Sequence, residues 1–125
     1  MKLTDVIAGA TFGVIPSDAP LGAFATPRGD GVSTNLYVLW QNTSTDIQVQ
    51  WIDDSVGWKG PATFPALQGA DSGTQIACLT PSDDYNTSLV NIPDMCRCFF
   101  QVHGAVREVS CANRKWSVVG TVPIS

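Results

Sequence analysis

An arginine and a glutamate stand on two segments that the sequence folds back on each other. Arg97 and Glu108 flank the dipeptide His103-Gly104, which is typical of a two-residue hairpin turn. Side chains alternate between the two faces of a hairpin, so a turn centred there places four residues on one face: Arg97, Phe99, Glu108 and Ser110. Arginine offers forked donors and glutamate accepts, so the pair suits adjacent hydroxyl groups of a ligand. The alternative is a surface ion pair that contributes only about 0 to 1 kcal/mol.

Two tryptophans recur at matching places and supply a second kind of chemistry. Trp58 and Trp116 each follow a turn, and each stands seven residues before a proline. A flat aromatic wall beside a few placed polar groups is the usual design of a site for sugars, which present an apolar C–H face as well as hydroxyls. The alternative is that both rings fill the core between the two halves of the chain.

These landmarks belong to an internal repeat. Segments of the first half recur in the same order in the second half, at offsets between 54 and 60 residues: 23–27 as 77–81, 36–41 as 96–101, and 47–51 as 106–110. Such self-similarity indicates two copies of one structural unit. We therefore divide the chain into a leading segment, 1–20, a first repeat, 21–66, and a second repeat, 67–125.

Each repeat is expected to form three or four short antiparallel strands. Turn-forming residues separate the apolar segments, and no window shows a helical period. Repeated modules of this size are typical of propeller blades. Two blades alone leave wide faces bare and edges unpaired, so we expect closure into a ring by oligomerisation, with segment 1–20 as an outer strand or latch.

The cysteines fall on the face opposite the arginine. In the hairpin register Cys96 lies directly across from Cys111, close enough for a cross-strand disulfide, and Cys98 lies on the same side. We nevertheless predict buried thiols for these residues and for Cys78. Residues 1–10 lack the basic cluster and apolar run of a secretory signal, so we expect a cytoplasmic or non-classically secreted protein.

Composition excludes several classes of function. The chain of 125 residues carries a net charge of -4 and only seven scattered Lys and Arg, which argues against a nucleic-acid partner. No apolar run approaches the roughly 18 residues that cross a bilayer, so membrane insertion is not expected. With one histidine, in a turn, and no C-x-x-C pair, no metal or other cofactor is expected.

The second repeat resembles the blade signature of a lectin family. The run 96–101, a short turn, Val106-Arg107-Glu108 and then Trp116 are similar to the repeat of the fungal and bacterial fucose-binding lectins, the Aleuria aurantia lectin family. The resemblance implies a six-bladed propeller, here from a homotrimer of two-bladed chains, that binds fucosylated glycans between blades. It implies that Arg97 and Glu108 hold the sugar, with Trp58 supplied by a neighbouring chain and Trp51 as a second candidate for that role.

The first repeat departs from this signature. Tyr37 stands at the arginine position and Val49 at the glutamate position. The site that would use Trp116 therefore lacks both polar anchors, and we predict that it is inactive or altered. One fucose-type site per chain is expected.

Two other functions compete with the lectin. A glycoside hydrolase needs two facing carboxyl groups, and only Asp53 and Asp54 are candidates to face Glu108. No Ser-His-Asp or Cys-His arrangement is evident, so we predict that the protein is not an enzyme. The other competitor is a noncatalytic interaction module that binds a protein or a different glycan. Agglutination of fucosylated cells, reversed by free fucose, distinguishes it from the fucose-binding lectin.

Overall fold

The chain forms two consecutive antiparallel sheets. The computed structural model describes residues 18–27, 34–53, 56–80, 96–112 and 115–122. Within them each sheet has four strands, in the order β1-β2-β3-β4 and β5-β6-β7-β8, and there is no α-helix. The predicted all-β class is confirmed, and each sheet has four of the three or four strands expected for a repeat. The predicted latch, 1–20, lies almost entirely outside the described residues.

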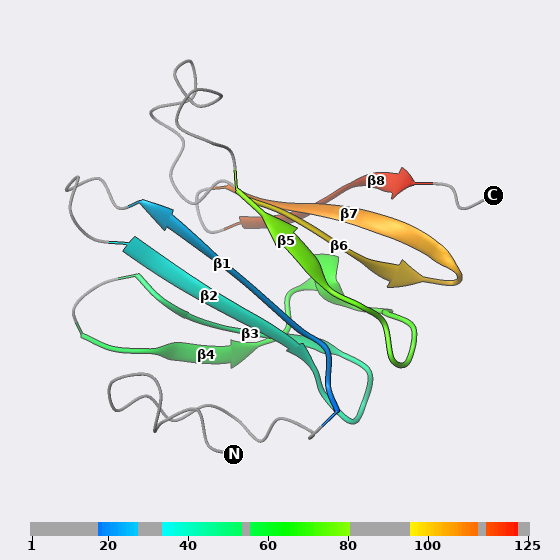
Figure 1. The fold of residues 1–125 in the computed structure, drawn as a ribbon, viewed down its shortest axis with the longest axis horizontal. Helices are drawn as coiled ribbons and strands as arrows, with labels where there is room; N and C mark the ends of the chain where they lie inside the picture. The colour runs from blue at the N-terminus through cyan, green and yellow to red at the C-terminus, as the bar shows by residue number, and fades with distance from the viewer. Residues whose placement is uncertain (1–17, 28–33, 54–55, 81–95, 113–114, 123–125) are drawn as a thin grey trace.

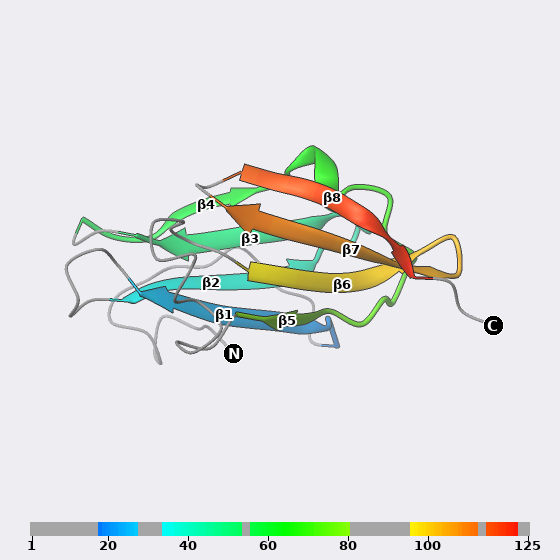
Figure 2. The same ribbon diagram turned by 90° about the horizontal axis from the view of Figure 1, so that it is seen from above.

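The strands are short and follow one another along each sheet. The first sheet comprises β1 (Leu21–Pro27), β2 (Thr34–Gln41), β3 (Ile47–Ile52) and β4 (Lys59–Ala62). After a 3-10 turn, η2 (Pro65–Leu67), come β5 (Ala77–Leu79), β6 (Cys96–Val102), β7 (Ala105–Ala112) and β8 (Lys115–Val122). The two sheets lie face to face, with β1 beside β5 (Figures 1 and 2).

The core lies between the sheets. The face of each sheet that is turned toward the other, here called the inner face, carries the side chains of the hydrophobic core. The core includes Tyr37, Leu39, Ile47 and Val49 from the first sheet, and Cys96, Cys98, Phe100, Val109 and Cys111 from the second. The alternation of side chains along β6 and β7 leaves a second set of residues on the other side of that sheet. This open face comprises Leu79, Arg97, Phe99, Gln101, Val106, Glu108, Ser110 and Val122.

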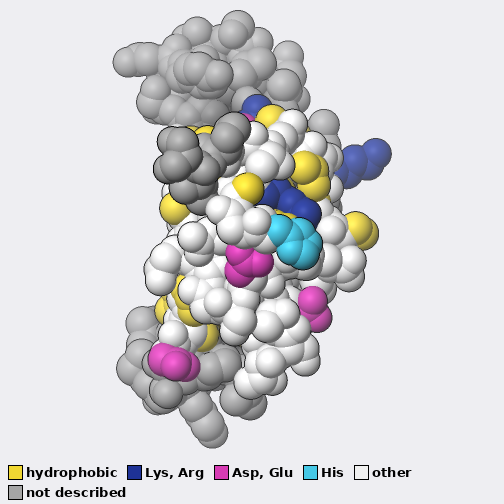
Figure 3. Space-filling view, turned by 90° about the vertical axis from the view of Figure 1, so that its right-hand side faces the viewer, with side chains coloured by type: hydrophobic (Ala, Val, Ile, Leu, Met, Phe, Trp, Pro, Cys, Tyr) yellow, Lys and Arg dark blue, Asp and Glu magenta, His cyan; other side chains and the backbone are white. Residues whose placement is uncertain are grey.

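The β6–β7 hairpin has the predicted register. Val102 pairs with Ala105, and the Phe99–Glu108, Arg97–Ser110 and Cys96–Cys111 pairs follow outward. His103 and Gly104 have φ of 51° and 78°, as the favoured two-residue turn requires. Backbone N–H groups of both donate to the carboxylate of Asp71, at 2.8 and 2.9 Å. The histidine is exposed at this end of the molecule, with acidic side chains nearby (Figure 3).

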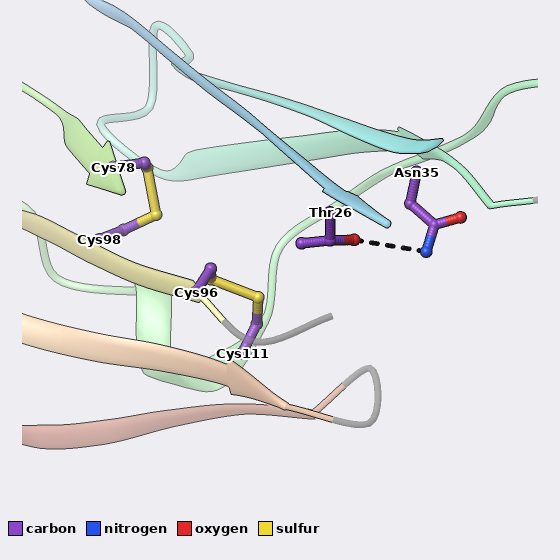
Figure 4. The surroundings of a disulfide bond; sticks show 6 residues. All are labelled: Thr26, Asn35, Cys78, Cys96, Cys98 and Cys111. Carbon is purple, nitrogen blue, oxygen red and sulfur yellow. Dashed lines mark hydrogen bonds between the residues drawn. A yellow bond between two sulfur atoms is a disulfide. The ribbon is translucent and has the colours of Figure 1, made fainter. Parts of the chain in front are cut away.

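All four cysteines are paired, so the prediction of thiols is wrong. Cys96 bonds to Cys111 across the hairpin, and Cys78 bonds to Cys98 across β5 and β6 (Figure 4). Both disulfides join neighbouring strands of the second sheet. The predicted opposition of Cys96 and Cys111 is confirmed. The prediction of thiols rested on the absence of a secretory signal in residues 1–10, and the disulfide across the hairpin follows from the register instead.

Gln41, the last residue of β2, ties the first sheet to the segment that leads into the second. Its amide donates to the carbonyl oxygens of Thr45 and Asp71, each at 2.9 Å, and its Oε1 accepts from the N–H of Gly73 at 2.9 Å. Since the side chain is buried, these bonds replace its lost hydration and fix the two sheets relative to each other.

None of the described segments forms a helix long and apolar enough to span a bilayer.

Candidate functional site

Arg97 and Glu108 form an ion pair on the open face. Nε of Arg97 lies 3.2 Å from Oε2 of Glu108, and their side chains are 35% and 25% exposed. The two residues are diagonal neighbours on β6 and β7. Arg97 lies directly opposite Ser110, and Glu108, two residues before Ser110, lies opposite Phe99. The predicted placement of both charges on one face is therefore confirmed.

The setting of this pair favours contact with a ligand. Leu79 flanks Arg97 on β5 and is 53% exposed, while Phe99 beside Glu108 is half-buried. A partly exposed ion pair contributes little to stability, about 0 to 1 kcal/mol. Its donors and acceptors, bordered by apolar side chains, can instead serve hydroxyl groups of a bound molecule.

A pocket lies between the two sheets. Its volume is about 250 Å³, and its walls are formed by Tyr37, Trp51, Asp53, Lys59, Ala62, Phe64 and Trp116. The aromatic rings contact one another across the sheets. The centroid of Phe64 lies 6.0 Å from that of Trp51 and 6.1 Å from that of Trp116, with which it is stacked. These rings give the pocket a wall that is mainly apolar.

One ion pair supplies the charge in this pocket. Nζ of Lys59 donates a hydrogen bond to Oδ1 of Asp53, so the two side chains form an ion pair. The carboxylate side chain is only 2% exposed, whereas the lysine side chain is 38% exposed. Lys59 reaches the pocket because it pairs with Trp51 in the β3–β4 register and so shares the face of that ring.

Gly60 allows β4 to approach β3 at this point. It has a φ of +85°, which side chains rarely adopt, and a Cβ added there would come within 2.7 Å of the Val49 carbonyl oxygen and 3.0 Å of the Trp51 ring. Only glycine therefore fits where β4 brings Lys59 and Ala62 beside Trp51.

The five predicted site residues fall into three places. Arg97 and Glu108 meet on the open face. Trp51 and Trp116 line the pocket between the sheets. Trp58, which directly precedes β4, does not belong to the pocket lining.

Two positions of the first repeat depart from the signature. Tyr37 lines this pocket, and Val49 is fully buried. Lys59 and Phe64 also line the pocket, and neither was predicted from the sequence. The sequence signal for Lys59 was its place directly before Gly60-Pro61, but the turn-forming residues 53–57 do not fix the register of β4.

Two of the three carboxylates considered for a hydrolase, Asp53 and Glu108, lie at different places in the described part of the chain. Asp53 lies in the pocket on the inner face of the first sheet, and Glu108 lies on the open face of the second. Asp54 falls outside the described residues. The described part of the chain contains no group of three His, Cys, Asp or Glu that could hold a metal ion.

Comparisons with known proteins identify the fold. No family model matches the chain, and no curated protein matches it. A solved structure, a triple arginine-to-alanine mutant of AofleA from Arthrobotrys oligospora, aligns with a TM-score of 0.64 at 22% sequence identity. The alignment covers 93% of this chain and 34% of that chain, so this chain spans about a third of its neighbour's length. The likeness confirms the propeller-type blade fold.

Proposed function

We propose that the chain is a noncatalytic carbohydrate-binding protein, a lectin, that holds a fucose-type sugar of a glycan at Arg97 and Glu108. The observation that carries this proposal is the partly exposed ion pair on the open face, bordered by apolar side chains. A charged pair of this kind offers donors and acceptors to neighbouring hydroxyls, and charge-assisted hydrogen bonds are the stronger class. The aligned solved structure supports the blade architecture in which such a face lies between blades.

We further propose that the open face is covered by another copy of the chain, in a homotrimer of six blades. Leu79 and Val122 on this face are 53% and 45% exposed. Exposed apolar side chains that share a face are typical of a surface that contacts another protein chain. Three copies of this chain match the length of the chain that it aligns with. In such a ring the next copy would place Trp58 near Arg97 and complete the sugar site.

Gln101 supports the same arrangement. It ends the arginine-bearing segment of the second repeat as Gln41 ends the matching segment of the first. Gln41 binds the chain leading into the following sheet, whereas the Gln101 side chain is exposed at the edge of the open face. A following blade from a second copy would give Gln101 the same role.

A glycan array tests the lectin proposal directly. The wild type is compared with Arg97→Ala and with Lys115→Ala, which removes an exposed cation from the same sheet. We expect wild type and Lys115→Ala to bind fucosylated glycans, and Arg97→Ala to lose at least tenfold in affinity at an unchanged molecular mass. Equal binding by all three proteins would refute the Arg97 site. Absence of glycan binding by a folded wild type would favour a module that binds a protein.

A further inference from the structure

We propose that Asn42 is a modification site, the acceptor of an oligosaccharide that is linked through its side-chain nitrogen. Asn42-Thr43-Ser44 has the pattern of such acceptors, an asparagine followed two residues later by a serine or threonine, with no proline between them. The pattern also occurs by chance. Three features of the structure therefore support the site: the exposure of the turn, the hydrogen bonds of the Asn42 amide, and the two disulfides.

The triplet lies in the turn between β2 and β3. Asn42 directly follows the last residue of β2, and β3 begins at Ile47. Thr43 and Ser44 are exposed, and Asn42 is partly exposed. A glycan is a bulky, hydrophilic group that needs a place on the surface, and this turn provides one.

Hydrogen bonds fix the orientation of the Asn42 amide. Its Oδ1 accepts from the backbone N–H of Ser44 at 2.9 Å and from that of Asp46 at 3.0 Å. The backbone closes the same turn, because the N–H of Asn42 donates to the carbonyl oxygen of Asp46 at 2.9 Å and the N–H of Thr45 donates to that of Asn42 at 3.1 Å. The oxygen of the amide is therefore the atom that holds the turn, which is a common role of asparagine.

Attachment of a glycan would leave these bonds in place. In the transfer, Nδ2 of Asn42 displaces the diphosphate from the anomeric carbon of a lipid-linked oligosaccharide. The new C–N bond forms, the C–O bond to the diphosphate breaks, the diphosphate leaves with the electron pair, and the amide nitrogen loses one proton. Oδ1 gains no substituent, so it can still accept from the N–H groups of Ser44 and Asp46. The folded turn can therefore carry the glycan.

The disulfides indicate the compartment in which such a transfer takes place. The Cys78–Cys98 and Cys96–Cys111 bonds leave no free cysteine. Disulfides form and persist in the lumen of the endoplasmic reticulum and outside the cell, and they are rare in the cytosol. Asparagine-linked glycans belong to the same secreted class of protein. We therefore expect passage through that compartment in place of the cytoplasmic or non-classically secreted location, which rested on residues 1–10.

The turn lies away from the proposed sugar site. Gln41, next to Asn42, donates to the backbone carbonyl of Asp71, and the carboxylate of Asp71 accepts from the tip of the β6–β7 hairpin. Asn42 is therefore at the end of the molecule where that hairpin turns. Arg97 lies five residues, or about 17 Å, from the end of β6 at this turn. A glycan on Asn42 would therefore leave Arg97 uncovered.

Mass spectrometry of the protein made in a secretory pathway tests the site. The full chain is produced behind a secretory leader in yeast and recovered from both the cells and the medium. It carries Asn86→Gln, which removes the other matching triplet, 86–88, outside the described residues. We expect most molecules to carry a glycan on Asn42 that peptide N-glycosidase removes, with conversion of Asn42 to aspartate.

Two single substitutions separate the triplet from its surroundings. Ser44→Ala removes the hydroxyl that the pattern requires but keeps the backbone N–H that binds Oδ1 of Asn42. Thr43→Ala is the matched control, because it truncates an equally exposed residue that the pattern does not specify. We expect Ser44→Ala to lose the glycan and Thr43→Ala to keep it.

The glycosylated chain must also fold. We expect it to contain both disulfides and to unfold at a urea concentration no lower than the unmodified Ser44→Ala protein. A glycan on Asn42 with these properties supports the inference whether or not the Arg97 site binds a sugar. An unmodified Asn42 in the disulfide-bonded protein, free thiols after passage through the secretory pathway, a glycan that survives Ser44→Ala, or a lower urea midpoint of the glycosylated form would overturn it.

Discussion

At the scale of single residues, position in the register decides which charges meet. Arg97 and Glu108 were predictable because the His103-Gly104 turn fixes every pair of the hairpin from sequence alone. Lys59 was not, because the register of β3 and β4 shifts between Val49 and Trp51 and the turn-forming residues that connect these strands do not define a register. The resemblance to a lectin repeat likewise gave the missing anchors of the first repeat, but not the Asp53–Lys59 ion pair of the pocket.

Replacement of Gly60 by alanine should destabilise the fold. The added Cβ would meet the Val49 carbonyl at 2.7 Å in a backbone conformation with φ of +85°. We expect Gly60→Ala to lower the free energy of unfolding by about 1 to 3 kcal/mol. Gly120→Ala is the control, since a Cβ there meets nothing within 4 Å. Chemical denaturation measures both, and equal losses would contradict the close approach at Gly60.

Asp71 should make stability depend on pH. Backbone N–H groups of Gly104 and His103 donate to its carboxylate and hold its pKa below the usual value. A lowered pKa in the folded state stabilises the fold above the ordinary carboxyl pKa of about 4, and this contribution is lost as the pH falls through the lowered value. We expect Asp71→Ala to melt below wild type at pH 7 and the difference to shrink toward pH 3. Ser72→Ala serves as the control, and a pH-independent difference would refute the explanation.

At the scale of elements, the sequence predicts the opposition of one pair of cysteines but not of the other. The cross-strand position of Cys96 and Cys111 followed from the hairpin, but the partner of Cys98 did not. Cys78 lies on β5, whose pairing with β6 brings residues together across a separation of 20 residues. No turn motif in that interval fixes the register, so this contact required the structure.

Reduction should destabilise the second sheet. Each disulfide closes a loop of 15 or 20 residues, and a loop of that size stabilises the fold by about 3 kcal/mol in the chain-entropy account. Because three of the sulfurs are buried, we expect a reductant to act mainly on the unfolded chain and to lower the urea midpoint. Titration of thiols in denaturant without reductant should find none. Four reactive thiols would show that the disulfides do not form.

At the scale of the whole molecule, the two faces of the second sheet differ in how much apolar surface they expose. The inner face is buried against the first sheet, and the open face carries Leu79 and Val122 at about half exposure. The repeat in the sequence predicted two blades and the need for a partner. It gave no means of counting partners, because the number of copies depends on the angle between blades.

The proposed ring should break when a charge is placed on the open face. We expect light scattering to give about three times the chain mass of 13.3 kDa for the wild type and one chain mass for Leu79→Lys, because the lysine would be buried without a partner. Ser44→Lys, on an exposed turn between β2 and β3, should keep the mass of the wild type. A wild type that is monomeric at all concentrations would refute the ring.

The disulfides also determine what a protease would release. Both bonds lie in the second sheet, and neither crosses to the first. A cut anywhere between residues 79 and 95 would leave two pieces joined through Cys78 and Cys98, which separate on a gel only after a reductant is added. A cut between residues 68 and 75 would free one piece from the other with no reductant. The two blades are therefore joined covalently only by the polypeptide segment between them, and otherwise by packing. Cleavage of that segment tests whether the two folded halves stay associated without a covalent link.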